Sequence, residues 1–360
     1  MNRKILLICH GIGNGGAQRV TTILANEFVK RNYQVRLVTF ARESQIYYIR
    51  EEIEYSPIHA TQKNKAARVL YRILKLRKIM KEFGPTCIIS LSAIPNLVTI
   101  VARGSMRFPL IISERTDPSR HPTEKYAILL RDILYHLPCA IVFQTSQARD
   151  WFRQSIRKKG VIIPNPVAQN LPEPFLGERR KEIVGVGSLV EQKDWMTLLR
   201  AYELLVAEYP EYQLIIYGDG EQRECLQEYI NSREILNGHV SMPGFVENIH
   251  EKIVSSAVFV SSAEYDGISN SVLEALALGI PSVCTDCPVG GAGMLIVDGK
   301  NGLLVPVKNA QGLYLAIKKI IENPILSEQL SREAVLVRKK FSTESIIKKW
   351  ENVINDCEKH

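Results

Sequence analysis

Short apolar runs alternate with amphipathic stretches through the first half of the chain. The runs have the length and the polar or glycine-rich flanks of buried strands. They predict strands at Lys4–Cys9, Val35–Phe40, Thr86–Leu91, Leu110–Ser113 and Ala140–Gln144. Between them, helical periodicity predicts one helix that ends at Val29 and another over Asn64–Phe83. Because strands that alternate with helices of this length need right-handed crossovers, this half predicts a parallel sheet.

The second half repeats this pattern. It predicts a helix that begins at Trp195 and strands at Glu182–Val186, Tyr212–Tyr217, Val240–Met242, Ala257–Val260 and Pro281–Cys284. Between the halves, four prolines within residues 164–174 oppose both a helix and a central strand. We therefore expect an α/β protein with two doubly wound, Rossmann-like domains, over residues 1–166 and 182–340, joined by a linker over 167–181.

Composition agrees with two domains, because 360 residues with 46% hydrophobic content are enough for two cores. The opening MNRKILLICH is typical of a first strand rather than a signal peptide, and no run of about 20 apolar residues predicts a membrane span. Seven scattered cysteines favour a reducing compartment, and Cys284 and Cys287 are expected to be thiols rather than zinc ligands. These features predict a cytoplasmic protein.

Charge divides unevenly between the halves. Residues 1–166 hold 27 Lys and Arg against 11 Asp and Glu, whereas the remainder holds 19 against 27. This asymmetry predicts an anionic partner for the first half. The segment Lys63–Lys81 concentrates eight of these basic residues beside an apolar stripe. Such a helix either lies on an anionic membrane surface or packs on the sheet with a solvated basic face.

Three loops follow predicted strands, where doubly wound sheets bind ligands. The first, Gly11–Gly16, lets the backbone approach a phosphate, but it matches neither a dinucleotide fingerprint nor a P-loop. The second ends at Lys193, a cation for a diphosphate or an ordinary surface lysine. The third carries Asp266 and, about two helical turns later, Glu274. These acids either hold sugar hydroxyls or are a solvated loop acid and an acid favourable to the helix dipole.

Taken together, these motifs are similar, in order and spacing and nearly end to end, to those of the family-4 retaining glycosyltransferases of the GT-B fold. They are GNGGAQR (13–19), SERTDP (113–118), IPNPV (163–167), VGSLVEQKD (186–194), YGDGEQ (217–222), PGFVENI (243–249), DGISNSVLEALALG (266–279) and TDCPVGGA (285–292). The resemblance implies two domains that face each other across a cleft. We also expect a C-terminal helix over 341–360 that crosses back to the first domain.

The resemblance also implies roles for individual residues. Glu274 would bind the ribose of a nucleotide-sugar donor, and Asp266, where the family usually has glutamate, would face the donor sugar. Lys193 would hold the diphosphate. Ser188 stands where the family usually has arginine, so another cation or helix amides would have to take over. The remaining donor-binding candidates are Gly15, Gly16 and Arg19 at the phosphates, Phe245 and Val246 at the base, and the Ser269, Asn270 and Ser271 amides as one replacement for the arginine.

Catalysis by such a site consists mainly of positioning and of stabilising the leaving diphosphate. Cations and helix dipoles are expected to do this without a metal or another cofactor, and no protein nucleophile is assigned. Glu114 is a candidate acid or base, although a strand-end acid paired with Arg115 is equally consistent with its position. Arg19 or Arg115 would otherwise replace the missing arginine.

The resemblance implies an enzyme of bacterial surface-polysaccharide assembly, such as O-antigen, capsule or exopolysaccharide. The expected partners are a nucleotide-sugar, a UDP-sugar above all, a glycan or polyprenyl-diphosphate-linked acceptor, and an anionic membrane surface at the inner face of the plasma membrane. Two alternatives remain. A nucleotide-sugar epimerase or a phosphorylase shares the two-sheet plan, and the pI of about 9.0 suits a non-enzymatic carbohydrate- or nucleic-acid-binding protein. We expect no nucleic-acid partner, because aromatic-interleaved basic patches are missing.

Overall fold

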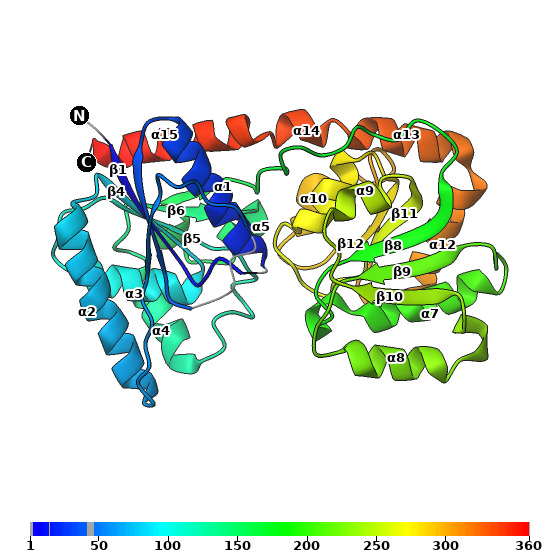
Figure 1. Ribbon diagram of the computed structural model, residues 1–360, viewed down its shortest axis with the longest axis horizontal. Coiled ribbons are helices and arrows are strands. Elements are labelled where there is room, and N and C mark those ends of the chain that lie inside the picture. Colours follow the sequence, from blue (N-terminus) through cyan, green and yellow to red (C-terminus); the bar gives the residue numbers. More distant parts are fainter. Residues whose placement is uncertain (1–2, 14, 42–46, 360) are drawn as a thin grey trace. The chain divides into compact units, whose positions relative to one another are not determined.

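Two compact units make up the chain in the computed structural model, which describes residues 3–13, 15–41 and 47–359. Unit 1 comprises Met1–Pro166 and Thr343–His360, and unit 2 comprises Val167–Ser342. Each unit contains one parallel sheet covered by helices (Figure 1). Among the described residues, no helix combines the length and the apolarity needed to cross a membrane.

The sheet of unit 1 has seven strands in the order β3-β2-β1-β4-β5-β6-β7, all of them parallel. Their bounds are β1 Lys4–Cys9, β2 Gln34–Thr39, β3 Glu54–Pro57, β4 Cys87–Leu91, β5 Leu110–Ser113, β6 Ala140–Phe143 and β7 Gly160–Ile162. In register, Ile5 lies opposite Val35 on one side and Cys87 on the other. This order confirms the predicted doubly wound sheet. The edge strands β3 and β7 were not predicted. Their residues are half-buried or exposed, and the two strands are only four and three residues long.

Capping residues set the two ends of the longest helix of unit 1. In α2 (Lys65–Phe83), the Asn64 side chain accepts hydrogen bonds from the Ala66 and Ala67 N–H groups, and Gly84 terminates the helix at φ 61°. Leu76, Met80 and Phe83 of α2 are buried, but the first half of the helix is exposed. The helices are α1 Gly16–Lys30, α2 Lys65–Phe83, α3 Ala93–Arg103, α4 Lys125–Leu134, α5 Ser146–Asp150, α6 Gln154–Arg157 and α15 Thr343–Glu358.

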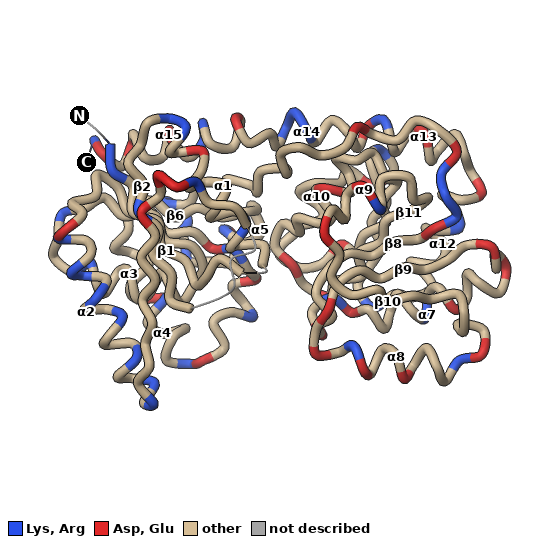
Figure 2. Tube along the Cα trace, in the orientation of Figure 1, with Lys and Arg blue, Asp and Glu red and all other residues tan. Residues whose placement is uncertain are grey.

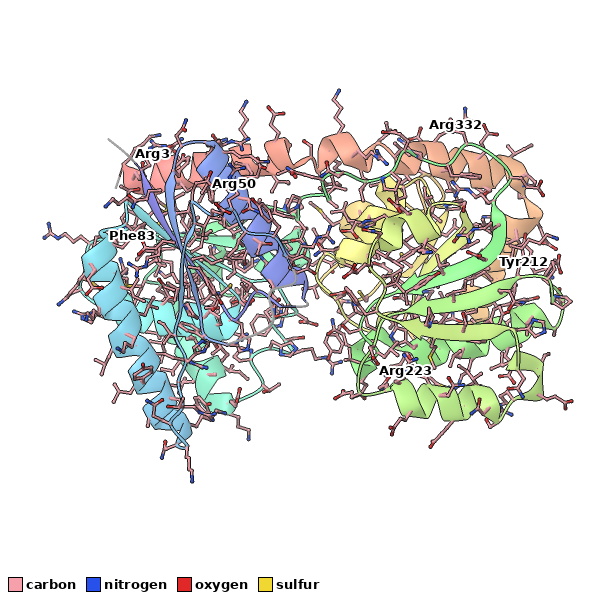
Figure 3. The ribbon with its side chains drawn as sticks, in the orientation of Figure 1. Arg3, Arg50, Phe83, Tyr212, Arg223 and Arg332 are labelled. Carbon is pink, nitrogen blue, oxygen red and sulfur yellow. A yellow bond between two sulfur atoms is a disulfide. The ribbon has the colours of Figure 1, made fainter. Side chains whose placement is uncertain are left out.

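The C-terminal helix α15 belongs to unit 1, although it follows all of unit 2 in the sequence. Trp350 is fully buried, and the Arg115 guanidinium lies 5.7 Å from the centre of its ring. At the other end of the chain lies Arg3, which is labelled in Figure 3. It pairs with Glu358 at 3.2 Å and donates to Asn355 at 2.7 Å. The start of β1 and the end of α15 therefore lie together on this unit (Figure 1).

A disulfide joins Cys139 and Cys357. The sequence analysis did not predict it, because the scattered cysteines favoured a reducing compartment. Cys139 immediately precedes β6, and Cys357 lies in the last turn of α15. Their Cα atoms are 5.8 Å apart, whereas 218 residues separate them in the sequence. Cysteine spacing could not reveal this pair, because only the return of α15 to unit 1 brings the two residues together.

Unit 2 contains six parallel strands in the order β10-β9-β8-β11-β12-β13. The strands are β8 Arg180–Val186, β9 Gln213–Tyr217, β10 Val240–Gly244, β11 Ser256–Ser261, β12 Ser282–Thr285 and β13 Leu303–Val305. The helices are η1 Glu191–Lys193, α7 Trp195–Val206, α8 Arg223–Asn231, η2 Glu234–Leu236, α9 Ile249–Ile253, α10 Asn270–Ala277, α11 Gly291–Leu295, α12 Ala310–Glu322, α13 Pro324–Ala334 and α14 Val337–Lys340. Trp195, Leu198 and Tyr202 of α7 are central to its core.

The predicted linker over residues 167–181 forms part of unit 2. Its Arg179 donates to the carbonyl oxygens of Val254, Ser256 and Gly279 at 3.0, 3.1 and 2.6 Å. Burial lowers the pKa of this guanidinium to about 10. The last two residues of the predicted linker, Arg180 and Lys181, already belong to β8, in the middle of the unit 2 sheet. Proline-rich composition does not report that the segment packs against this sheet.

The burial of Trp350 predicts how strongly α15 contributes to unit 1. Replacing Trp350 by alanine removes a large side chain from a closed core, so Trp350→Ala should lower the free energy of unfolding by about 3–5 kcal/mol. Chemical denaturation would measure this change. The exposed Lys348→Ala on the same helix is the matched control and should change stability by less than about 0.5 kcal/mol. Equal effects of the two substitutions would contradict the assignment of α15 to this core.

Candidate active site

In unit 2, the strand order reverses between the neighbouring strands β8 and β11. Sheets of this kind bind ligands at such a point, outside the carboxyl ends of the strands. The loop after β8 leads to Lys193, and the loop after β11 contains Asp266. The fold thus brings two of the predicted site residues to one edge of the sheet.

Lys193 and Asp266 form a direct ion pair. The Nζ atom of Lys193 lies 2.5 Å from Asp266 Oδ2, and Gln192 Nε2 lies 3.4 Å from Asp266 Oδ1. Both charged side chains are less than one-fifth exposed, at 18% and 19%. Ser262 also donates to the Lys193 carbonyl at 2.9 Å. The ammonium and the carboxylate are therefore held in place by each other and by neighbouring loop groups.

Close backbone contacts fix the loops that carry this pair. A Cβ atom on Gly218, whose φ is 136°, would lie 1.9 Å from the Gly187 carbonyl oxygen. Likewise, a Cβ atom on Gly291 would lie 1.8 Å from the Gly267 carbonyl oxygen. Only glycine allows such approaches. The loops after β8 and β11 are consequently packed against the loops after β9 and β12.

Glu274 lies on α10 and is 7% exposed. Its Oε2 atom lies 2.8 Å from Nε2 of His250, which is on the neighbouring short helix α9. A nearly buried carboxylate needs such a partner. The sequence analysis did not identify His250, because the residue lies 24 positions before Glu274 and carries no spacing signal of its own.

Ser269, Asn270 and Ser271 form the start of α10, where Ser269 is the N-cap residue and makes no side-chain capping bond. The hydroxyls of Ser269 and Ser271 are 3.0 Å apart. A pocket lies beside this helix start. It is lined by Ser261, Ala263, Asp266, Gly267, Ser269, Val272, Thr285, Cys287, Ala292 and Leu295.

The other predicted donor residues of unit 2 lie on loops. Ser188 is exposed, and its carbonyl oxygen accepts a hydrogen bond from Trp195 Nε1 at 2.9 Å. Phe245 is 59% exposed, and Val246 is half-buried. An exposed phenylalanine ring after a strand end offers a surface on which a planar base can stack. The roles of these residues stay predictions.

Cys284 and Cys287 are buried and form no disulfide. Burial raises the pKa of the Cys287 thiol to about 12, and the nearby Asp266 carboxylate acts in the same direction. The thiol therefore stays neutral near physiological pH. Within the described residues, no three His, Cys, Asp or Glu side chains gather as a metal site would require.

Unit 1 holds the remaining candidates. Gly15 is the N-cap residue of α1, Gly16 is its first residue, and Arg19 lies in its first turn. All three follow β1, which neighbours β4 at the point where the order of this sheet reverses. Asn14, within the same predicted loop, lies outside the described residues.

Glu114 directly follows β5 and is 1% exposed. The Tyr135 hydroxyl donates to its Oε1 atom, and Asn96 Nδ2 lies 3.4 Å from the same oxygen. The Oε2 atom has no hydrogen-bond partner among the described residues. Glu114 thus faces the interior of unit 1, and its role as an acid or base stays a prediction.

Arg115 is also buried, at 6% exposure. Its Nη1 atom donates to Asn165 Oδ1 at 3.0 Å, and its guanidinium lies against Trp350. Burial lowers the pKa of Arg115 to about 10. The charges of Arg115 and Glu114 nevertheless act on each other, because Arg115 lowers the pKa of Glu114 and Glu114 raises that of Arg115. The pairing of Glu114 with Arg115 stays one of the two interpretations of this carboxyl group.

Comparison with known proteins agrees with this architecture. The Glycosyltransferase Family 4 model matches residues 14–170, and the model named Glycosyl transferases group 1 matches residues 168–336. Together with the two doubly wound sheets, these matches show that the chain belongs to the family-4 glycosyltransferases of the GT-B fold.

Relatives of this chain match it over almost its whole length. An uncharacterized glycosyltransferase of Haemophilus influenzae is 24% identical over 98% of this chain and 100% of its own. An undecaprenol-linked-glycan α-1,4-N-acetyl-D-galactosaminyltransferase of Campylobacter jejuni is 24% identical over 98% of both chains. Among solved structures, Anabaena HepE in complex with UDP and glucose has a TM-score of 0.84 at 16% identity, over 98% of this chain and 100% of its own.

The buried position of Glu114 predicts a pH-dependent stability. Desolvation raises its pKa from 4.5 to about 7, against the opposing effects of Tyr135 and Arg131. The folded protein therefore holds this proton more tightly than the unfolded chain, and the unfolding free energy should fall as pH rises from 4.5 to about 7. The total contribution is up to about 3 kcal/mol.

Denaturation of wild type and Glu114→Gln across this pH range would measure the contribution. Between about pH 5 and pH 8, the difference in stability should shift in favour of the glutamine variant by up to about 3 kcal/mol. The exposed Glu82→Gln is the control and should show no such shift. A constant difference between wild type and Glu114→Gln would mean that the carboxyl group does not titrate in this range.

Proposed function

We propose that this glycosyltransferase moves a sugar, with retention of anomeric configuration, from a UDP-sugar to a lipid-linked or growing glycan in bacterial polysaccharide biosynthesis. The observation that carries the proposal is the Lys193–Asp266 ion pair beside the start of α10, at the point where the strand order of unit 2 reverses. This edge offers a cation, helix amides and two acids within one sheet region. A nucleotide diphosphate sugar has the matching groups: two phosphates, a ribose and a second hydroxyl-bearing ring.

Each part of the donor has a proposed partner. Glu274, oriented by His250, would accept hydrogen bonds from the two ribose hydroxyls. Lys193 and the backbone N–H groups at the start of α10 would hold the diphosphate. Asp266 would face the sugar, and Phe245 would stack on the base. Uridine as the base is supported by the solved structures of HepE with UDP and with UDP-glucose.

The reaction follows from this arrangement. The bond between the sugar C1 atom and the diphosphate oxygen breaks as the acceptor hydroxyl oxygen bonds to C1 on the same face. The acceptor proton passes to the departing phosphate oxygen, so no protein nucleophile is required. Lys193 and the α10 amides stabilise the negative charge that develops on the diphosphate. The metal-independent character of the proposal rests on these fixed positive groups.

Support for the acceptor comes from the relatives. The Campylobacter jejuni enzyme is named for a polyprenol-diphosphate-linked glycan, and a further relative for the biosynthesis of amylovoran. A lipid-linked acceptor would also account for the basic character of the first half of the chain. We therefore place the enzyme at the inner face of the plasma membrane. Incubation with nucleotide sugars alone, and then with lipid extract, tests for transfer and separates it from epimerisation of the donor.

The ribose assignment predicts a loss of donor affinity in Glu274→Ala. A charged hydrogen-bond acceptor contributes about 1.5–3 kcal/mol, so UDP should bind roughly tenfold to a hundredfold more weakly. Calorimetry with UDP measures this directly. Glu251→Ala, an exposed acid on α9, is the control and should bind UDP normally. Unchanged affinity in Glu274→Ala would place the ribose elsewhere.

The diphosphate assignment predicts that Lys193→Ala reduces turnover by at least about tenfold, or roughly 1.4 kcal/mol of barrier. The exposed Lys181→Ala should leave turnover intact. Transfer by the wild type should also persist in EDTA, because Lys193 and the α10 amides supply the positive charge. Activity that disappears in EDTA and returns with magnesium or manganese would refute the metal-independent proposal.

A further inference from the structure

The helix α4 directs its apolar side chains outward and its arginine inward. Ala127 and Arg131 are its buried residues, and Arg131 is only 1% exposed. The large apolar side chains on the opposite side are between 42% and 63% exposed. They recur at helical spacing and continue one turn past the helix: Tyr126, Leu129, Leu130, Ile133 and Leu137. We call these five residues the α4 apolar face. A surface helix usually shows the reverse arrangement.

Contacts of Arg131 explain why α4 is oriented this way. Its Nη1 atom donates to the carbonyl oxygens of Pro118 and His121 at 2.7 and 2.9 Å. Its guanidinium also lies 4.6 Å from the centre of the Trp151 ring. Pro118 and His121 belong to the segment that follows β5 and Glu114. The inward side of α4 therefore secures this loop, and the leucines and isoleucine are left outside.

Single exposed leucines are ordinary, but five large apolar side chains on one helix face are not. This face keeps apolar area in water, so an apolar partner would stabilise it. The question is which partner the surrounding charges favour.

The neighbouring helix α2 supplies a positive surface. Between residues 63 and 81 the chain carries eight Lys and Arg and no Asp or Glu, and Figure 2 shows these basic positions along α2. Lys65 joins the two helices, because its Nζ atom lies 2.6 Å from Glu124 and 5.7 Å from the centre of the Tyr126 ring. Leu70 and Leu74 of α2 are also 57% exposed. Apolar and basic groups thus occur together here.

We propose that the α4 apolar face inserts into the headgroup region of an anionic bilayer, while the basic residues of α2 contact the lipid phosphates. Apolar side chains beside Lys and Arg are the combination that binds such membranes. A second copy of the chain fits less well, because it would bring a second positive α2 toward the first. The proposal deepens the proposed function, on which it rests, by naming the surface that would reach a lipid-linked acceptor.

This placement links the bilayer to the loop after β5. The same helix that contacts lipid holds Pro118 and His121 through Arg131, and Tyr135, one residue beyond α4, contacts Glu114. Membrane contact would therefore orient the Glu114 segment of unit 1 toward the bilayer in which the acceptor resides.

The test uses the full chain and vesicles of phosphatidylglycerol and phosphatidylcholine. The double variant Leu129→Gln/Ile133→Gln removes two exposed side chains without opening a core, so it should fold normally. Its partitioning onto these vesicles should fall by about a hundredfold or more, since each of the two aliphatic side chains contributes at least about tenfold when buried. Leu315→Gln/Ile325→Gln, which changes two exposed side chains of unit 2, is the matched control and should bind vesicles as the wild type does.

Insertion is distinguished from electrostatic adsorption by a second variant, Leu129→Trp. Its fluorescence should shift to the blue on vesicles and be quenched by brominated acyl chains. Equal vesicle binding by wild type and Leu129→Gln/Ile133→Gln would overturn the proposal. A wild-type dimer that becomes a monomer in the double variant, with no vesicle binding by either, would assign the face to a second copy instead.

UDP calorimetry on the same proteins separates this proposal from the proposed function. The double variant should bind UDP as the wild type does, because none of its changed residues lies in unit 2. A wild type that binds vesicles through α4 but binds no UDP would leave the membrane surface standing and refute the donor site. If the wild type binds UDP but the α4 substitutions do not change vesicle binding, the donor site would stand and the membrane proposal would be refuted.

Discussion

Parallel strand pairing is the constraint on which the site depends. Because every strand of unit 2 runs in one direction, every loop that follows a strand leaves from the same edge of the sheet. The reversal of order between β8 and β11 then opens space between the helices that follow them. Lys193 and Asp266, 73 residues apart in the sequence, meet there at 2.5 Å. Glycines at positions such as 218 and 291 let the supporting loops pack closely enough to hold this pair.

Unit 1 contains buried charged side chains, which need partners inside the unit. Its interior contains Glu114, Arg115 and Arg131, and each depends on contacts with other side chains or carbonyl oxygens to stay there. Tyr135 contacts Glu114, and Trp350 of the returning helix α15 covers Arg115. The polar contacts of Arg131 also decide which side of α4 is exposed. An interior built to hold charged groups has therefore left an apolar face in contact with solvent.

Much of the fold follows from local pattern. Strongly apolar runs such as Lys4–Cys9 and Leu110–Ser113 are strands with the predicted bounds, because burial on both faces leaves polar residues only at their ends. The edge strands β3 and β7 were not predicted, since one side of each is open and each is only three or four residues long. The start of α2 also differs from its periodicity: Val69 is 36% exposed, although Leu76 of the same stripe is fully buried. Periodicity predicts which side chains share the apolar face of a helix. It does not predict how much of that face a neighbouring element covers.

By itself, the sequence determined the α/β class, the two doubly wound sheets and the loops that carry Lys193, Asp266 and Glu274, because these depend on local hydrophobicity and on where polar residues follow strands. Tertiary structure alone decided that Lys193 neutralises Asp266 and that His250 contacts Glu274. It likewise decided the disulfide of Cys139, whose partner lies 218 residues away. Such pairs join groups from separate elements, and their distances depend on how those elements pack. No spacing along the chain encodes that packing.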